Sequence, residues 1–571
     1  MPPGSGRKPF PEWAEVEETG TKVKCKHCNQ EVSARIERIR AHLSGCKMRI
    51  SQRNKNTARS QPSYMEGNLA LEDTLPFEDD TVEDCAPGPS KRKQSQPAIS
   101  AYGVTTSKKQ KGGLDAKVAT FFYACNVPFN VAQRKEFKDM VASLRPGYGP
   151  PDRKQLGGKL LDDAFQAVED SLKKELTSVK SVTLLIDGWS SCQNDPVTAV
   201  SVHTGQKSYL LDMYDSGSQK KTAEYCAARA EDAMKKIQDN FGCDVFAVCT
   251  DNENKMLKMR KLLEESHSGL VTYGCSAHYL NLLVKQVLPS KLLNKIVRVQ
   301  KYFKNHHQPH GWLQEKNGLL PQLPCDTRWS SNFECVRTFL ENFHKYNEIR
   351  LEHPSDFCSD VAAVLESPAI FTDTRLMKDM LGILNSALSQ LQSEKATLST
   401  AAQTWISLEV APELHHVNAE IKYRASQALA PAHFLAYLMD PSAAPDILSQ
   451  GREEIALNWL AARHPEFVPF VLKFKVKDPE TFPQYVMLPQ VLEEFVPGQW
   501  WHVLGIQLRD SQKLPATFCD YFAKLLSCTA SAASIERIFS SCGMVWSAVR
   551  NRLGLEKAAK LVEIHRHFRS D

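Results

Sequence analysis

Long apolar segments are missing from this chain of 571 residues. A helix that crosses a bilayer needs about 20 consecutive apolar residues, and no stretch of the sequence meets that requirement. The N-terminal sequence, Met1-Pro-Pro-Gly-Ser-Gly-Arg-Lys8, also lacks the apolar segment of a secretory signal. We therefore expect an intracellular protein without a membrane partner.

A large net charge is missing as well. The formal net charge is +5 at pH 7, so any affinity for nucleic acid has to come from local patches. Residues 1–60 hold thirteen Lys and Arg against six Asp and Glu, whereas residues 61–90 hold eight acids and no base. Basic clusters return at Lys91-Arg92-Lys93 and Lys108-Lys109-Gln110-Lys111. They predict import into the nucleus, although a run of charge is also typical of a solvated linker.

Cysteines occur, but without regular spacing. The sixteen cysteines are scattered through a long chain, which argues against a disulfide scaffold and favours buried thiols and a few metal ligands. One group has ligand spacing, since Cys25 and Cys28 are followed by His42 and Cys46 in the pattern C-x2-C-x13-H-x3-C. His42 and Cys46 lie one helical turn apart and can face one ion, so this pattern predicts a tetrahedral zinc site.

Basic side chains surround the predicted zinc ligands. Arg35, Arg38 and Arg40 lie on the expected helix that carries His42, where they can meet phosphates or base edges of DNA. The segment from about residue 8 to residue 50 resembles a BED-type zinc finger. That resemblance implies binding to double-stranded DNA.

Two aspartates end short apolar runs in the centre of the chain. Val182–Asp187 and Asp244–Asp251 are β-branched and unbroken, as strands buried on both faces are. Three strands followed by alternating helices and strands predict a ribonuclease H-like fold, in which the first and fourth strands are parallel neighbours. Asp187 and Asp251 would then lie close together and hold Mg²⁺ or Mn²⁺. The alternative is that each Asp caps a turn, and Asp195, Asp212 and Asp215 are nearby acids better suited to turns.

Five motifs in order resemble those of the hAT transposase family. They are Asp187-Gly188-Trp189-Ser190, Thr250-Asp251-Asn252, Cys275-Ser276-Ala277-His278, Asp326-Thr327-Arg328-Trp329, and Ser531 to Ser540 together with Arg550 to Leu553. One departure is Lys255, where the family has Asn.

The resemblance implies a cut-and-paste DNA transposase. Asp187, Asp251 and Glu536 would form an acidic triad that holds two divalent cations, nicks transposon ends, forms hairpins on the flanking DNA and joins the excised ends to target DNA. Trp329 would stack on a flipped base beside Arg328, unless it is a core tryptophan. Cys275 and His278 are too few for a zinc site, which leaves contact with DNA or a structural role.

The expected organisation is multidomain. We predict a zinc finger at 1–50, a disordered acidic and basic linker at 51–113, a helical DNA-binding or dimerisation domain at 114–178, the first part of a ribonuclease H-like core at 179–325, an all-helical insertion at 326–517, and a segment at 518–571 that completes the core and carries the family's dimerisation region. In this scheme one long helix spans about 534–568, and His306, His307 and His310 lie in a loop.

Two functions remain open from the sequence. The first is an active hAT-type transposase that acts as a dimer or a larger homo-oligomer. The second is a domesticated relative that binds DNA and regulates transcription or chromatin without catalysis. The presence of all three acids favours the enzyme.

Overall fold

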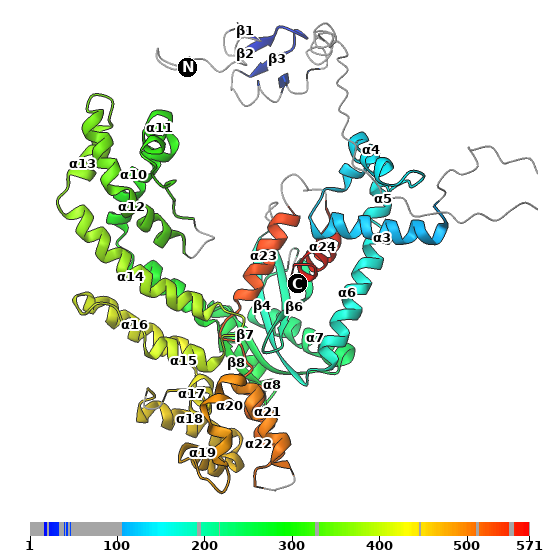
Figure 1. Cartoon of the computed structure of the whole chain (residues 1–571), viewed down its shortest axis with the longest axis vertical. Coiled ribbons are helices and arrows are strands. Elements are labelled where there is room, and N and C mark those ends of the chain that lie inside the picture. Colours follow the sequence, from blue (N-terminus) through cyan, green and yellow to red (C-terminus); the bar gives the residue numbers. More distant parts are fainter. Residues whose placement is uncertain are drawn as a thin grey trace, which may run out of the picture. The chain divides into compact units, whose positions relative to one another are not determined.

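The computed structural model describes residues 16–19, 22–33, 39, 42, 43, 46, 106–190, 196–215, 217, 219–325, 330–444, 447–509, 513–546 and 553–569. The chain divides into two compact units, residues 1–96 and 97–571. Each unit is described by itself (Figure 1). No helix among the described residues is long and apolar enough to cross a membrane.

The first unit contains a small antiparallel sheet. Its strands are β1 (Val16–Thr19), β2 (Lys22–Cys25) and β3 (Glu31–Ser33), in the order β1-β2-β3. Val16, Val23, Ile39 and Leu43 are buried together with two of the cysteines. So small a core gains little from apolar burial, and folds of this size usually need a metal or a disulfide.

The second unit begins with a helical segment. It comprises α3 (Lys108–Ala124), η3 (Phe129–Gln133), α4 (Lys135–Leu144), α5 (Arg153–Leu156) and α6 (Lys159–Thr177). Capping boxes fix the N-terminal ends of two of these helices: Ser107 pairs with Gln110 at the start of α3, and Asp152 pairs with Gln155 at the start of α5.

A five-stranded mixed sheet follows. Its strands are β4 (Ser181–Ser190), β5 (Pro196–His203), β6 (Ser208–Asp215), β7 (Asp244–Thr250) and β8 (Val271–Gly274), in the order β6-β5-β4-β7-β8. The β4–β5 and β5–β6 pairs are antiparallel, whereas β4–β7 and β7–β8 are parallel. The predicted meander and central parallel pair are therefore present. One boundary differs, because β4 continues three residues beyond Asp187 while it remains paired with β5.

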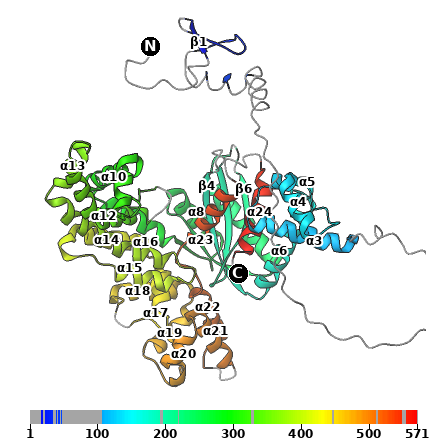
Figure 2. The ribbon, with the colours of Figure 1, turned by 45° about the horizontal axis from the view of Figure 1, so that its top comes forward.

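Helices cover both faces of this sheet (Figures 1 and 2). On one face, Leu184 and Ile186 of β4 pack with residues of α7 (Ala223–Phe241) and α8 (Asn254–Ser266). On the other face, Leu185 belongs to the larger core that also contains the C-terminal helices. This alternation follows from the two-residue period of a strand and explains the unbroken apolar run of β4.

All elements from α9 to α22 are helical in the part of the chain that the structure describes. The first group is α9 (Ser276–Val287), α10 (Ser290–Asn305), α11 (His307–Glu315), α12 (Ser331–Glu352), α13 (Ser359–Glu366), α14 (Ala369–Leu391) and α15 (Leu398–Ile406). The second group is η4 (Pro412–Leu414), α16 (His415–Ala428), α17 (Pro431–Leu438), α18 (Gln450–Arg463), η5 (Pro465–Phe467), α19 (Val468–Lys475), η6 (Gln484–Met487), α20 (Pro489–Glu494), α21 (Pro497–Gln507) and α22 (Ala516–Leu525). The predicted loop at His307 and His310 is wrong, because both residues lie in α11.

Two helices close the chain. They are α23 (Ala533–Val545) and α24 (Leu555–His567). The prediction of one long helix is therefore wrong, because α23 ends at Val545 and Gly554 caps a new helix. Helix α23 packs on β4, β5 and β6, whereas α24 packs on α3, α6 and β6.

Candidate functional site

The four predicted zinc ligands come together in the first unit. Cys25 ends β2, Cys28 lies in the turn that follows, and His42 and Cys46 come from the later segment. Their ligand atoms all lie within 4.8 Å of one another, and the Sγ of Cys28 is 3.2 Å from the Nε2 of His42. Three thiolates and one imidazole match the donor set and number that structural zinc prefers. The cluster can therefore bind one zinc ion.

The predicted DNA contacts of the finger lie outside the described residues. This applies to Arg35, Arg38 and Arg40. It applies equally to Arg328 and Trp329 in the second unit. Their roles stay predictions.

Asp187 and Asp251 are adjacent positions on neighbouring strands. The parallel pairing of β4 with β7 ends at Ile186 and Thr250, and each aspartate is the next residue. Neighbouring strands lie about 4.8 Å apart. Leu185 and Cys249, two residues earlier on each strand, both face the core that contains α23. The strand period therefore directs both aspartates toward α23.

Glu536 lies in the first turn of α23. The helix is held against β4 by apolar contacts, in which the ring of Trp189 stacks on Phe539 at 5.8 Å with an interplanar angle of 14° and lies 6.5 Å from Trp546. The tryptophan of the first motif thus fixes the helix that carries the third acid.

The three carboxylates are electrostatically coupled. Desolvation and then the charge of Asp251 raise the pKa of Asp187 to about 7. Desolvation and then the charge of Asp187 raise the pKa of Glu536 to about 8. The pKa of Asp251 is also raised, mainly by desolvation. Desolvation and like-charge repulsion destabilise the ionised form of a carboxylate, and a bound cation stabilises that form.

The three acids are spaced more widely than the zinc ligands. Among the described residues, the zinc cluster is the only group of three or more Cys, His, Asp or Glu whose ligand atoms all lie within 4.8 Å. The triad is therefore more open than the zinc cluster. Paired divalent cations lie about 3.5–4 Å apart and need ligands spread around both. Carboxylate oxygens are also the ligands that Mg²⁺ and Mn²⁺ prefer.

Two lysines flank the acids. Lys255 forms an ion pair of 2.5 Å with Glu253, and its charge lowers the pKa values of Asp187 and Asp251. Lys221 donates to the Oγ1 of Thr198 at 3.1 Å and is also within electrostatic range of Asp187. In the sequence, Lys255 stands out only as a departure from a family pattern. Lys221 was not predicted, and its one signal in the sequence is the Lys220-Lys221 pair that precedes α7.

The end of β7 is fixed by contacts that position Asp251. Arg260 is buried and donates from Nη1 to the backbone oxygen of Asp251 at 2.8 Å. Asn252 donates to the backbone oxygen of Cys275 at 3.0 Å. Gly274 leaves room for that side chain, since a Cβ at this position would lie 1.8 Å from the Oδ1 of Asn252. Asp251 also accepts from the backbone N–H of Glu253 at 3.1 Å, which is the turn-capping contact foreseen as the alternative role.

Cys275 is buried, and its contacts are structural. It is 3% exposed, its Sγ accepts from the backbone N–H of Ala532 at 3.3 Å, and burial raises its pKa to about 12. This position supports the structural alternative for Cys275. His278 is half-buried in the first turn of α9, and the charge of Asp251 raises its pKa against a larger lowering by desolvation.

The segment before α23 is clamped by the turn between α14 and α15. Ala530 donates to the backbone oxygen of Ala396 at 2.8 Å, and Ser531 donates to that of Leu391 at 2.7 Å. Arg537, which follows Glu536, forms an ion pair of 3.0 Å with Glu394 of the same turn. The helical region thus contributes directly to the placement of Glu536.

The other candidate acids have different partners. Asp212 forms an ion pair of 3.2 Å with Lys236, and Asp215 accepts from the backbone N–H of Gly217 at 2.8 Å. Asp195 lies outside the described residues. Neither Asp212 nor Asp215 is among the charges with the largest effect on the pKa of Asp187, Asp251 or Glu536.

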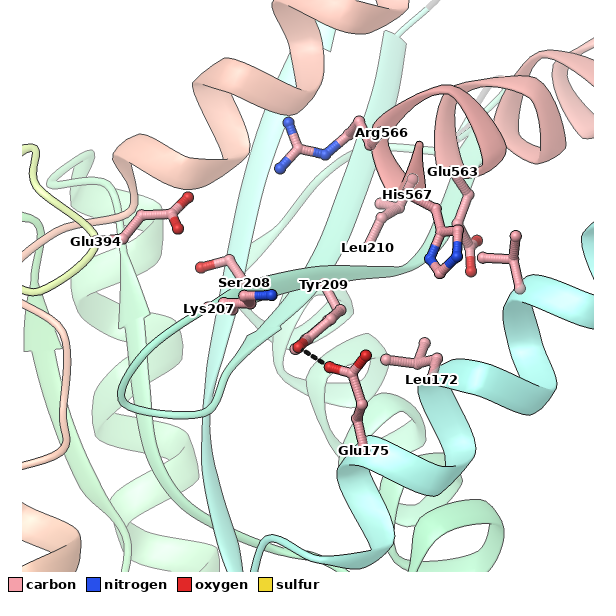
Figure 3. A pocket seen from close by; sticks show the side chains of 11 residues that line it. Leu172, Glu175, Lys207, Ser208, Tyr209, Leu210, Glu394, Glu563, Arg566 and His567 are labelled. Atoms are coloured by element: carbon pink, nitrogen blue, oxygen red, sulfur yellow. Dashed lines mark hydrogen bonds between the residues drawn. The ribbon is translucent and has the colours of Figure 1, made fainter. Parts of the chain in front are cut away.

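A cavity of about 340 Å³ lies between α6, the start of β6 and α24 (Figure 3). Tyr209 donates to Glu175 within it, and Glu394 of the clamping turn also lines it. Desolvation and then the charge of Glu169 raise the pKa of Glu563 in its wall to about 8. Its lining carries both signs of charge and none of the three acids of the triad.

Comparisons with known proteins match two parts of the second unit. Residues 151–302 match a family described as a domain of unknown function, DUF659, and residues 478–568 match the hAT family C-terminal dimerisation region. The chain is also similar to two maize (Zea mays) proteins, the putative AC transposase and the putative AC9 transposase. Both are 25% identical over 251 residues, which is 39% of this chain. The matched part is 30% of the first maize protein and 29% of the second.

Proposed function

We propose that this chain, which is a relative of the hAT transposases, is a metal-dependent DNA transposase whose site is formed by Asp187, Asp251 and Glu536. The predicted resemblance to this family is confirmed by the match at residues 478–568 and by the similarity to the maize transposases. The acids, the metal and the reaction are our proposal.

The observation that carries the proposal is the convergence of three carboxylates from distant segments. They come from β4, the end of β7 and the first turn of α23, and their pKa values are raised together. The strand order β6-β5-β4-β7-β8, with antiparallel pairing before β4 and parallel pairing after it, supports a ribonuclease H-like core.

Divalent cations, when bound, supply Lewis-acid activation of the attacking oxygen and stabilise the leaving oxygen. In this proposal the ionised carboxylates of Asp187, Asp251 and Glu536 hold the cations. Since the pKa values of Asp187 and Glu536 are about 7 and 8, protons must leave these groups before they serve as ligands. Lys221 and Lys255 lie beside the acids and would contact the phosphate to be cleaved.

The finger, the partners and the location complete the proposal. The Cys25, Cys28, His42 and Cys46 cluster would hold zinc in a BED-type finger that binds DNA. The match to a dimerisation region supports self-association. The substrates would be transposon ends and target DNA, cut by nicking and hairpin formation. The basic clusters at 91–93 and 108–111, the second of which begins α3, would direct the chain to the nucleus.

The test is cleavage of DNA that the full chain itself selects from a random library, incubated with Mn²⁺. We expect nicks followed by hairpins from the wild type and their loss in Glu536→Gln and Asp187→Asn. Asp212→Asn is the matched control, because Asp212 is a β6 acid paired with Lys236. It should retain cleavage.

Selective DNA binding without cleavage by the wild type would contradict the enzyme. That result would instead support a domesticated DNA-binding regulator.

A further inference from the structure

One long segment of the second unit contains no acidic residue. The chain has 66 Asp and Glu residues, yet none lies between Glu265 and Glu315. The same segment carries six cations, which are Lys285, Lys291, Lys295, Arg298, Lys301 and Lys304. It forms β8, α9, α10 and most of α11.

Helix α10 sorts these cations onto one face. Lys291, Lys295, Arg298 and Lys301 are all exposed, and we call them the α10 stripe. At 100° per residue they fall within an arc of about 120°, and they extend over about 15 Å of helix. The opposite face is buried, with Leu293, Ile296, Val299, Gln300 and Phe303 at most 9% exposed. The stripe is therefore fixed in direction by the core beneath it.

The stripe has no acidic partner among the described residues. None of its four side chains takes part in an ion pair or a hydrogen bond with another described residue. Cations on neighbouring helices behave differently. Lys316 pairs with Glu348 and Glu352, Arg337 with Glu334 and Glu341, and Arg350 with Glu366. Exposed cations are normally interspersed with acids, so four unpaired cations on one face have a cost in mutual repulsion.

We propose that the α10 stripe binds the phosphate backbone of duplex DNA. The proposal rests on the proposed function for the identity of the nucleic acid, and it adds a binding surface outside the finger and the acidic site. The exposed face of α10 contains only Lys, Arg and Asn side chains between Lys291 and Lys301. Protein interfaces have an apolar and aromatic centre, whereas phosphate contacts need only charge and polar donors.

The position of α10 connects the stripe to the acidic site. Helix α9 begins near Asp251, because the charge of Asp251 raises the pKa of His278 in the first turn of α9 against a larger lowering by desolvation. Only Leu288 and Pro289 separate α9 from α10. Helix α9 has 12 residues and is about 18 Å long, which is roughly half of the ~34 Å turn of duplex DNA. A duplex with one strand at the acids would therefore have backbone within reach of the stripe.

The test is the salt dependence of binding of the full chain to a 40-base-pair duplex of mixed sequence. The plot of log K against log salt concentration has a negative slope, and each phosphate contact makes it steeper by about 0.9. We expect the slope of the fourfold variant Lys291→Gln, Lys295→Gln, Arg298→Gln and Lys301→Gln to be smaller in magnitude than that of the wild type by about 3 to 4. Every slope given below refers to this magnitude. Gln keeps the helix propensity of these exposed positions.

The matched control removes the same charge elsewhere. It carries Gln at Lys235, Lys261, Arg509 and Lys513, which are exposed and lie on α7, α8 and the segment after α21. Its slope should stay within about 1 of the wild type. If the fourfold variant does not fold, the double variant Lys291→Gln and Arg298→Gln should lower the slope by about 2.

An unchanged slope in the folded stripe variant, or an equal loss in the control, would overturn the proposal. So would a slope loss with single-stranded RNA but not with duplex DNA. The outcome is separable from the proposed function, because binding is measured without Mg²⁺ or Mn²⁺. A lower slope in a chain that never cleaves DNA would support the stripe and contradict only the enzyme.

Discussion

Replacing Glu536 by Gln should stabilise the second unit when Mg²⁺ and Mn²⁺ are absent. The wild-type carboxyl has a pKa of about 8, raised by desolvation and then by Asp187. Because the pKa of this carboxyl is higher in the folded chain than in the unfolded chain, its contribution to stability is fully present below the unfolded-state pKa. That contribution is lost as the pH rises through the folded-state pKa. The destabilisation of the wild type is therefore largest above about pH 8.

The magnitude follows from the size of the shift. A rise in the pKa of Glu536 from the ordinary value of 4.5 to about 8 corresponds to at most about 5 kcal/mol, at 1.36 kcal/mol per pKa unit. Glu536 is half-buried, so solvent screening and coupling to Asp187 reduce the expected gain to about 2 kcal/mol. Gln has nearly the same shape and no charge.

The assay is thermal unfolding of the full chain at pH 5 and at pH 8.5, in buffer that contains zinc but no Mg²⁺ or Mn²⁺. We expect Glu536→Gln to melt higher than the wild type at pH 8.5, with a smaller difference at pH 5. Added Mg²⁺ should raise the melting temperature of the wild type more than that of the variant. The exposed α8 variant Glu265→Gln is the control and should change neither curve. A Glu536→Gln chain that melts lower than the wild type at pH 8.5 would refute this reasoning.

Three further predictions concern other parts of the molecule. Cys46→Ser should lose the zinc of the finger, measured as about one zinc less per chain by atomic absorption, whereas an unchanged zinc content would exclude Cys46 as a ligand. Glu394→Gln should lower DNA cleavage about tenfold without loss of helicity, because the ion pair with Arg537 positions Glu536, and unchanged turnover would show that this pair is dispensable. The pKa of His433 is lowered to about 4 by desolvation, so wild-type stability should fall by up to about 3 kcal/mol as pH drops from 6.5 to 4. His433→Gln should flatten that pH dependence in thermal melts, and an equally steep curve would contradict the assignment.

The strands of the sheet were predictable because their local signals agree. Val182 to Ile186 is a run of β-branched and apolar residues, all of them buried, as burial of a strand on both faces requires. The end of β4 was predicted too early because a glycine such as Gly188 is typical of a turn. Pairing with β5 nevertheless continues to Ser190, where it meets Pro196. Tertiary pairing thus overrides local turn propensity at this point.

The helix boundaries show a different limit. Apolar spacing continues from α23 into α24, so periodicity alone joined them, while the cap at Gly554 marks the true start of α24. Around the start of α11, Pro309 and the histidines at 306, 307 and 310 suggested a loop. Pro309 is however the third residue of the helix, where a missing N–H costs nothing.

The acids themselves were found from strand ends and from family motifs, but their environment was not. Nothing local in the sequence indicates that Arg260 holds Asp251 or that the turn at Glu394 holds α23. The contact of Arg537 with Glu394 joins residues 143 positions apart, and Arg260 reaches Asp251 across nine residues from within α8. Their existence depends on the packed structure and not on any short pattern.

The central claim is that Asp187, Asp251 and Glu536 together hold divalent cations. Its most direct test is a Mn²⁺ titration of the full zinc-loaded chain at pH 8.5, in which free Mn²⁺ is followed by electron paramagnetic resonance. The account predicts saturable binding by the wild type and by Asp212→Asn, and weakened binding by Asp187→Asn and Glu536→Gln. Equal Mn²⁺ binding by all four proteins would contradict it.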